Sequence, residues 1–258
     1  MLQAIRLQWQ ACIMEWSDEG IVLAARAHGE SAAIVEVLTR DHGRHLGLVR
    51  GGASRRAKPT LQPGNTIHLH WRARLEEQLG AFTAEPLRAR AGELLEDRAS
   101  LTGLNAFSSM SSAALPEREP HAPVFEVAEI LLDAMRDDTF SHWSPLYVRW
   151  EAGLLEALGF GLDLTRCAAT GVLDDLIYVS PRTGRAVSAA AGAQYKERLF
   201  ALPAFLLGNQ NAEPTAADIA AGLRLTGHFL FERVLAPHNR EMPQARHRLD
   251  EWASRESK

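Results

Sequence analysis

The 258-residue sequence has few cysteines and no apolar run long enough to suggest a membrane span. Its two cysteines, Cys12 and Cys167, cannot build a disulfide framework, so the chain needs no oxidising compartment. The opening "MLQAIRLQWQACI" carries one positive charge and is interrupted by glutamine, which is too polar and too short for a signal peptide or a span. We therefore expect a protein of the bacterial cytoplasm with no membrane partner.

Lysine is also scarce, and the motifs of nucleotide-driven or hydrolytic enzymes are missing. The three lysines, Lys58, Lys196 and Lys258, all lie outside any Gly-x-x-x-x-Gly-Lys-Ser/Thr loop. No Gly-x-Ser-x-Gly elbow and no His-Glu-x-x-His pair is present. Gly159-Phe-Gly161 follows a helical pattern and lacks the third glycine of a dinucleotide fingerprint. We expect no catalytic residues, no cofactor and no nucleotide.

Charge is distributed unevenly. The net charge of −4 argues against a protein that binds nucleic acid over its whole surface. However, residues 14–92 carry 11 Arg and Lys against 9 Asp and Glu, whereas residues 93–258 carry 16 against 23. The densest basic stretch spans nineteen residues with a single acid, Asp41, and contains Arg40, Arg44, Arg50, Arg55, Arg56 and Lys58. The amino-terminal part is therefore the candidate for contact with a polyanion.

Between Gly20 and about Arg90, five short β-type runs alternate with turn residues such as Asp41-His42-Gly43 and Pro63-Gly64-Asn65. The fourth run shows the period of two most clearly. Its expected inner face holds Ile67, Leu69, Trp71, Ala73 and Leu75, and its outer face holds His68, His70, Arg72 and Arg74. Five strands in about seventy residues predict a small closed barrel of the OB kind, a fold that often holds oligonucleotides.

From about Glu93 the hydrophobic period becomes helical, which predicts an α+β protein with the helical part at 93–258. One helix is expected to bury Val124, Val127, Leu131 and Met135. A second is expected to begin at Pro145 and to bury Leu146, Trp150, Leu154 and Leu158. A third is expected to be capped by Thr215 and to end at Pro237.

Residues 162–191 resemble a zinc ribbon that has lost most of its ligands. Two Cys-x-x-Cys knuckles separated by a strand and a turn are typical of such a ribbon. Here the two positions read Cys167-Ala-Ala-Thr170 and Ser188-Ala-Ala-Ala191, with "LIYVS" and "PRTG" between them. One thiol cannot supply the four ligands of structural zinc. We expect no metal, and we expect packing by Leu173, Leu176, Ile177 and Val179 to hold the segment.

Several segments, taken in order, resemble the RecO family of DNA repair and recombination mediators. They are "DEGIVLAARAHGESAAIVEVLTRDHGRHLGLVRGGASRR", "YVRWEAGLLEALGFGLDLTRCAATG", "YVSPRTGRAVS" and "MPQARHRL", and together they cover nearly all of residues 16–249. The resemblance implies an OB-fold domain (14–92) followed by a helical domain with a degenerate zinc-ribbon-like insertion (about 162–191). Residues 1–13 precede the family-like sequence and are expected to form an extension with little structure.

The resemblance also implies an activity. Members of the family bind single-stranded DNA, anneal complementary strands, and act with RecR and the single-stranded-DNA-binding protein to load the recombinase. The residues expected to contact DNA are Arg26, Arg44, Arg50, Arg55, Arg56, Lys58, Arg72 and Arg74. The alternative to DNA contact is that the basic stretch is an ordinary solvated surface. For Arg26, the alternative is a hairpin turn that needs a polar exit.

Other candidate sites are weaker. His68 and His70 share a strand face, but no third metal ligand lies nearby in the sequence, and Trp71 alternates with aliphatic residues, which favours the core over base stacking. The acidic tail of the single-stranded-DNA-binding protein is expected to bind a groove edged by basic residues, for which the candidates are Arg149, Arg166, Arg182 and Arg185. The leading hypothesis is therefore a nucleotide-free annealing protein. The alternative is an adaptor for repair-protein assembly with weak DNA binding, and a third is a hydrolase whose site no motif reveals.

Overall fold

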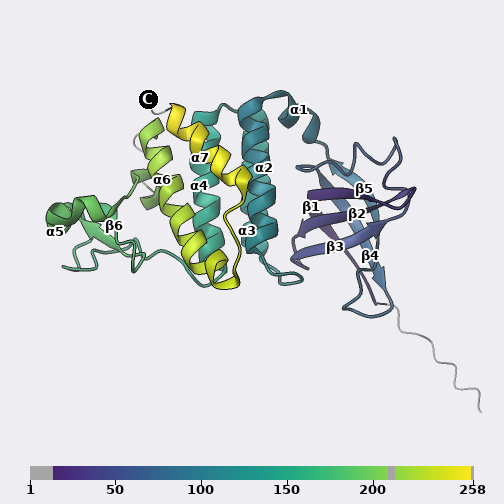
Figure 1. Cartoon of the computed structure of the whole chain (residues 1–258), viewed down its shortest axis with the longest axis horizontal. Coiled ribbons are helices and arrows are strands. Elements are labelled where there is room, and N and C mark those ends of the chain that lie inside the picture. The colour runs from purple at the N-terminus through teal and green to yellow at the C-terminus, as the bar shows by residue number, and fades with distance from the viewer. Residues whose placement is uncertain (1–13, 209–212, 257–258) are drawn as a thin grey trace, which may run out of the picture.

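The computed structural model describes residues 14–208 and 213–256, and it arranges them in three parts along one axis (Figure 1). A β-barrel lies at one end, a body of packed helices in the middle, and a small sheet at the other end. The predicted extension, residues 1–13, lies outside the described residues. Within the described part, no helix is long and apolar enough to cross a membrane.

The barrel confirms the five predicted strands. They close in the order β1-β2-β3-β5-β4, with β3 and β5 parallel and the other neighbours antiparallel. Their bounds are β1 (Met14–His28), β2 (Ala32–Thr39), β3 (Arg44–Val49), β4 (Thr66–Ala73) and β5 (Ala81–Arg88). β1 begins six residues before the predicted Gly20, because residues 14–21 pair with β4 along its whole length. The result is an OB-like ring of five strands.

The predicted alternation on β4 holds with one exception. Ile67, Leu69 and Trp71 are buried in the barrel, and Arg72 is exposed. Leu75, predicted to face inward, is 59% exposed. The strand ends at Ala73, so Leu75 lies in the following turn and no longer obeys the period of two.

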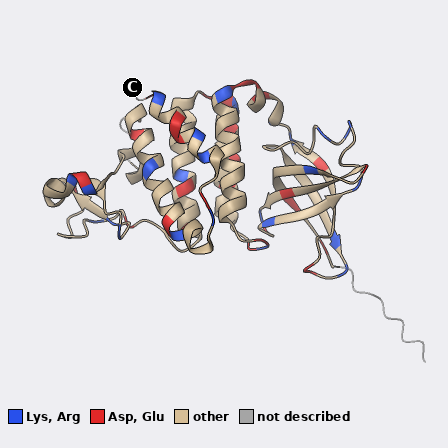
Figure 2. Cartoon of the chain, in the orientation of Figure 1, with Lys and Arg blue, Asp and Glu red and all other residues tan. Residues whose placement is uncertain are grey.

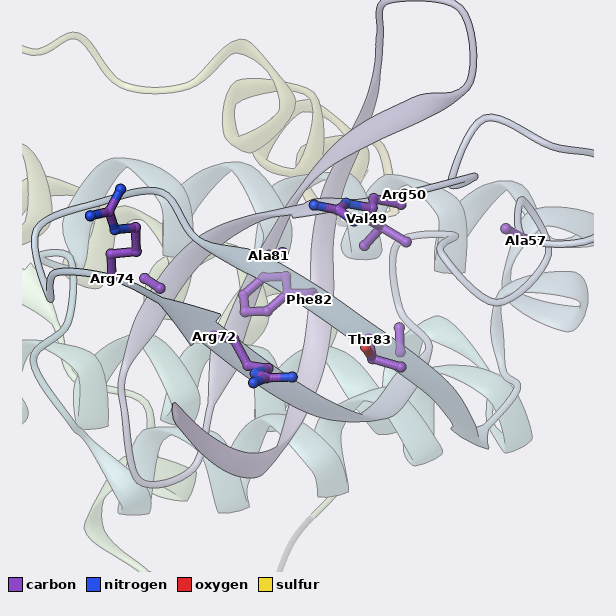
Figure 3. A pocket seen from close by; sticks show the side chains of 10 residues that line it. Val49, Arg50, Ala57, Arg72, Arg74, Ala81, Phe82 and Thr83 are labelled. Atoms are coloured by element: carbon purple, nitrogen blue, oxygen red, sulfur yellow. The ribbon is translucent and has the colours of Figure 1, made fainter. Parts of the chain in front are cut away.

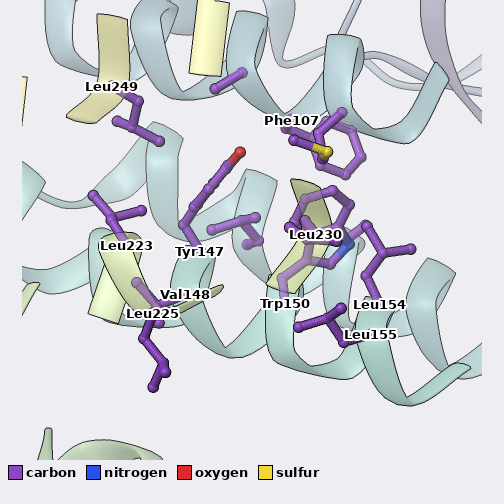
Figure 4. Close-up of a cluster of buried hydrophobic side chains, with 14 of the residues drawn as sticks. Phe107, Tyr147, Val148, Trp150, Leu154, Leu155, Leu223, Leu225, Leu230 and Leu249 are labelled. Carbon is purple, nitrogen blue, oxygen red and sulfur yellow. The ribbon is translucent and has the colours of Figure 1, made fainter. Parts of the chain in front are cut away.

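The helical body confirms an α+β architecture. Its helices are α1 (Ala91–Glu96), α2 (Arg98–Ala114), α3 (Ala122–Asp137), α4 (Phe140–Ala157), α6 (Ala216–Phe229) and α7 (Gln244–Glu256). A π-helical turn, η3 (Leu230–Leu235), and a 3₁₀ turn, η4 (Ala236–His238), follow α6. Aromatic and aliphatic side chains from α2, α4, α6, η3 and α7 meet in the centre, as the cluster around Tyr147 and Trp150 shows (Figure 4).

Two helix predictions need correction. α4 begins at Phe140, five residues before Pro145, because the Thr139 carbonyl accepts hydrogen bonds from the following turn and the helix starts there. Val127 on α3 is 37% exposed, whereas the other three residues predicted on that face are buried. The predicted cap of α6 is confirmed, since Thr215 and Asp218 form a reciprocal capping box.

A buried ion pair crosses the helical body. The Arg246 guanidinium donates to both oxygens of Glu151, at 2.6 and 2.9 Å, and both side chains are fully buried. Arg246 also donates to Asp250 at 2.5 Å and to the Leu223 carbonyl at 2.8 Å, and Thr226 donates to Glu151 at 2.5 Å. The pair therefore links α4, α6 and α7 in one network of hydrogen bonds.

The small sheet contains β6 (Leu176–Val179), β7 (Ala186–Ser188) and β8 (Phe200–Ala201) in the order β7-β6-β8, and α5 (Ala189–Gly192), η1 (Ala193–Arg198) and η2 (Ala204–Leu207) accompany it. The excursion thus continues past the predicted end at 191, because β8 pairs with β6. Leu176 and Val179 are buried as predicted. Leu173 and Ile177 are 68% and 40% exposed, so the prediction that they pack inside is wrong.

The barrel is joined to the helices by Arg90, which is fully buried at the start of α1. Its guanidinium donates to Asp133 at 2.6 Å and to Glu129 at 3.0 Å, both on α3, and to Thr66 of β4 at 2.7 Å. Asn65 accepts hydrogen bonds from the backbone of Arg90 and Ala91. One side chain thus ties a barrel strand to a helix.

A second junction lies where the α2–α3 connection crosses the barrel. The Arg118 amide donates to the Arg44 carbonyl at 2.8 Å, and its side chain donates to the carbonyls of Glu76 and Gln78. Gly43 has a φ of +68°, and a Cβ there would lie 2.1 Å from the Glu119 carbonyl oxygen. Glycine is therefore required at this close approach. Together with the junction at Arg90, this second junction holds the barrel at two separate places.

Candidate nucleic-acid interface

A cleft of about 570 Å³ is lined by residues of β3, β5 and β4 and by residues that follow β3 and β4, and it reaches the barrel-core residues Val49, Ala73 and Phe82. Arg50, Arg72 and Arg74 surround Phe82 in this first cleft (Figure 3). The other residues that line it are Val49, Ala57, Ala73, Ala81, Thr83 and Ala84. The structure therefore brings together three of the predicted basic residues, and no acidic side chain lines the space between them.

Strand geometry explains why these arginines converge. Arg72 lies on the outer face of β4, and Arg74 follows that strand by one residue. Arg50 directly follows β3, which is linked to β4 through β5. Arg72 pairs with Glu15 at 3.2 Å, but both side chains are more than half exposed, so the pair contributes little. Within the described residues, the side chains of Arg50 and Arg74 have no ion-pair or hydrogen-bond partner.

A second cleft, of about 270 Å³, is lined by residues of β1, β2 and the segment that follows β3, and it reaches the barrel-core residues Ala33 and Leu61. Arg26 and Lys58 are its charged residues, and the rest of its lining is small or apolar apart from Gln62. Both cations are exposed. Neither has an ion-pair partner in the described part of the chain. Arg26 and Lys58, predicted separately from a hairpin and from a loop, therefore meet at one site.

The segment 50–64 connects β3 to β4 and contributes to both clefts. Its own backbone hydrogen bonds order it: the amides of Lys58 and Leu61 donate to the carbonyls of Ser54 and Ala57. Leu61 is buried in the barrel core. Arg55 and Arg56 lie exposed on this segment without a partner among the described residues. Figure 2 shows basic residues on loops and strand ends of the barrel, together with acidic residues on its strands and loops.

Arg44 is the exception among the predicted DNA contacts. It is 8% exposed, and its guanidinium donates to Glu36 at 2.7 Å and to the Leu115 carbonyl at 2.8 Å. Glu117 lies 3.6 Å away. With these partners inside the protein, Arg44 is unavailable to a phosphate, and its role is to join the barrel to the α2–α3 connection.

Aromatic residues at the barrel end were not predicted as a group. The Trp16 ring stacks on His42 with centroids 4.0 Å apart and lies 5.6 Å from Trp71. Trp71 is 1% exposed, which agrees with the predicted core position. His70 accepts or donates a hydrogen bond with Ser17 at 2.9 Å. No group of three or more His, Cys, Asp or Glu in the described residues is placed to hold a metal ion.

The four arginines suggested for partner binding have different surroundings. Arg149 donates to the Phe205 carbonyl at 2.9 Å, and Arg185 pairs with Asp163 at 3.1 Å. Arg166 and Arg182 are exposed and have no ion-pair partner among the described residues. None of the four lines the apolar groove of about 390 Å³ between α3 and α4, where Glu156 is the one charged lining residue. The basic-edged groove thus remains a prediction.

The knuckle around Cys167 is stabilised by hydroxyl groups. Cys167 is 1% exposed, and its sulfur accepts hydrogen bonds from the Ser188 amide at 3.3 Å and the Ser188 hydroxyl at 3.4 Å. Burial raises the pKa of the Cys167 thiol, but hydrogen bonds from Ser188 and Thr170 outweigh it and lower the pKa to about 6. One sulfur, two hydroxyls and the methyl of Ala191 do not fit zinc.

The lowered pKa predicts a thiolate in the folded protein at neutral pH. Because the folded pKa lies below the ordinary thiol value of about 8.5, the stability that ionisation adds is present above that value and is lost as pH falls through 6. In a Cys12→Ser background, ultraviolet titration of the thiolate should show a midpoint near 6, and Ser188→Ala should raise it. A midpoint near the ordinary value in the parent protein contradicts this arrangement.

Comparison with known proteins assigns the family. Residues 14–90 match the model for "Recombination protein O N terminal", and residues 95–241 match "Recombination protein O C terminal". The chain is 54% identical over 244 residues to a DNA repair protein RecO of Cereibacter sphaeroides, covering 94% of this chain and all of the relative. It is 52% identical to that of Rhodospirillum centenum, over 92% of this chain and 93% of the relative, and 52% identical to that of Phenylobacterium zucineum, over 90% and 95%. The predicted resemblance is confirmed: the chain belongs to the RecO family of DNA repair and recombination proteins.

Proposed function

We propose that the barrel binds single-stranded DNA and anneals complementary strands without nucleotide. The observation that carries the proposal is the convergence of cations around the segment 50–64. Six of them have no partner among the described residues, namely Arg26, Arg50, Arg55, Arg56, Lys58 and Arg74. Cations without internal partners keep their full charge available for phosphates, and phosphate neutralisation dominates non-specific affinity for nucleic acid.

The physical basis of annealing follows from this charge. Two single strands repel each other through their phosphates, and the repulsion is reduced where arginines neutralise both backbones. The bases then pair by their own hydrogen bonding and stacking, so the protein supplies no chemical step. Arg72 assists in the first cleft by exchanging its weak, exposed pair with Glu15 for a phosphate.

The helical body is proposed as the binding surface for partner proteins. On the family's pattern these are RecR and the acidic carboxyl-terminal tail of the single-stranded-DNA-binding protein, and the assembly loads the recombinase. Of the four arginines suggested for the tail, Arg166 and Arg182 are the ones with a free guanidinium in the described structure. Arg149 and Arg185 are engaged with Phe205 and Asp163, so an acidic tail has to compete for them.

The small sheet is proposed to be a zinc ribbon that has replaced its metal with hydrogen bonds. The Cys167 amide donates to the Val172 carbonyl at 2.8 Å, and the Gly171 amide donates back to the Cys167 carbonyl at 2.9 Å, which closes a tight knuckle. Ser188, at the second knuckle, reaches the Cys167 sulfur. These contacts join the two knuckles that zinc holds together in a ribbon.

The test of DNA binding is an Arg55→Ala/Arg56→Ala variant. Both side chains are exposed on a segment that its own backbone hydrogen bonds order, so the fold is expected to be unchanged. Removing two of about five phosphate contacts should slow annealing of two labelled complementary strands at least tenfold, in the absence of ATP and with chelator present. The assay is the rate of fluorescence quenching on duplex formation.

The matched control is Arg224→Ala/Arg248→Ala, which removes two exposed arginines from α6 and α7. This variant should anneal at the native rate. If the native protein does not anneal strands at all but still binds RecR, the adaptor function is the better description. If both double variants slow annealing equally, the barrel is not the site of action.

A further inference from the structure

Two basic clefts flank one ordered segment on the barrel. The first is lined by residues of β3, β5 and β4, and the second by residues of β1 and β2. The segment 50–64 contributes Arg50 and Ala57 to the first cleft and Gly52, Ala53, Lys58 and residues 61–63 to the second. Consecutive residues Ala57 and Lys58 thus face different clefts, so the segment is a wall between them.

The wall is built to hold its position. Besides its internal turns, the Ala53 amide donates to the Ser31 carbonyl at 3.0 Å, and the Asn65 side chain donates to the Pro59 carbonyl at 2.7 Å. A Cβ on Gly52 would lie 2.8 Å from the Ala33 side chain, which shows how closely the wall's base packs on β2. A strand in one cleft therefore cannot enter the other without passing over the wall.

The two clefts differ in charge from two other hollows of the described structure. Neither is lined by an acid, whereas Glu156 lines the groove between α3 and α4, and Asp174 and Asp175 line the hollow beside the small sheet. Each cleft has at least two exposed cations of its own. Arg55 and Arg56 lie exposed on the wall between them.

From this arrangement we propose that the barrel holds two single strands at once, one in each cleft, with Arg55 and Arg56 screening the repulsion between them. The inference rests on the proposed DNA binding and gives it a mechanism. A site for one strand binds DNA without bringing a second strand near it. Annealing needs two strands close together with their bases free. Two clefts separated by a charged wall meet this requirement within a single chain.

The test uses two variants that each remove two unpaired charges. Arg50→Ala/Arg74→Ala alters the first cleft, and Arg26→Ala/Lys58→Ala alters the second. The probe is an oligothymidylate of about 10 nucleotides, within the roughly 4 to 16 that one OB fold holds. Native mass spectrometry at low salt counts the strands bound per chain, and thermal unfolding confirms that each variant folds.

We expect two strands per native chain, one per chain for either double variant, and none for the quadruple variant. Each double variant should anneal at least tenfold more slowly than the native protein while it still binds one strand. A native count of one, or a count of two that survives either double variant, overturns the two-cleft proposal. Those results leave the proposed DNA binding intact. A native count of zero refutes the DNA binding itself.

Discussion

Replacing Arg246 with alanine is expected to lower the free energy of unfolding by about 3 to 5 kcal/mol, the range for breaking a fully buried ion pair from one side. The substitution leaves the Glu151 carboxylate in the core with Thr226 as its remaining side-chain donor. It also removes the link from α7 to α4 and to the Leu223 carbonyl of α6. Urea unfolding followed by circular dichroism measures the loss.

Arg248→Ala is the matched control, because Arg248 lies two residues away on the same helix and is exposed. It should change the free energy of unfolding by less than about 0.5 kcal/mol. The double variant Glu151→Leu/Arg246→Met removes both charges and should recover most of the stability that the single variant loses. Equal losses for Arg246→Ala and Arg248→Ala contradict the assignment of the buried pair.

The affinity for a single-stranded oligonucleotide is expected to fall about 100-fold when monovalent salt rises from 50 to 200 mM. This expected fall in affinity assumes five phosphate contacts for a strand in the first cleft, from Arg50, Arg55, Arg56, Arg72 and Arg74. At a slope of about −0.7 per contact, log affinity falls with log salt at about −3.5. Fluorescence anisotropy at four or more salt concentrations gives the slope.

Variants make the salt prediction specific. Arg55→Ala/Arg56→Ala should reduce the slope to about −2.1, since two contacts are removed. Arg44→Ala should leave the slope unchanged in protein that remains folded, because Arg44 is engaged inside the protein. A slope near zero for the native chain, or a smaller slope after loss of Arg44, is incompatible with the site described.

The barrel could be predicted because its determinants are local. The alternation on β4 and the glycine-containing turns can be recognised in short stretches of sequence, and they predicted the five strands. The same short stretches predicted the exposed cations on 50–64. Arg44 belongs to the same basic stretch, but one of its partners, the Leu115 carbonyl, lies 71 residues away, and another, Glu36, lies just before the stretch on β2. Nothing within the stretch distinguishes an arginine that faces solvent from one that joins two parts of a protein.

The junctions and the buried pair were missed for the same reason. Glu151 and Arg246 are 95 residues apart, and α7, which carries Arg246, is so rich in charged residues that its narrow buried stripe is hard to recognise. The spacing of Arg246 and Asp250, and of Glu251 and Arg255, each four residues apart, was a local signal of this helix. Trp16 was missed because the first strand was expected to begin only at Gly20.

The two junctions between barrel and helices also bear on the direction in which DNA would leave the proposed clefts. Arg90 clamps the barrel to α3, and Arg44 with Arg118 clamps it to the α2–α3 connection. Fixed at two separate places, the barrel has no pivot about which to turn. If DNA binds in the two clefts as proposed, a partner bound to the helices would therefore fix the direction in which each strand leaves the barrel, and loading would depend on orientation as well as on affinity.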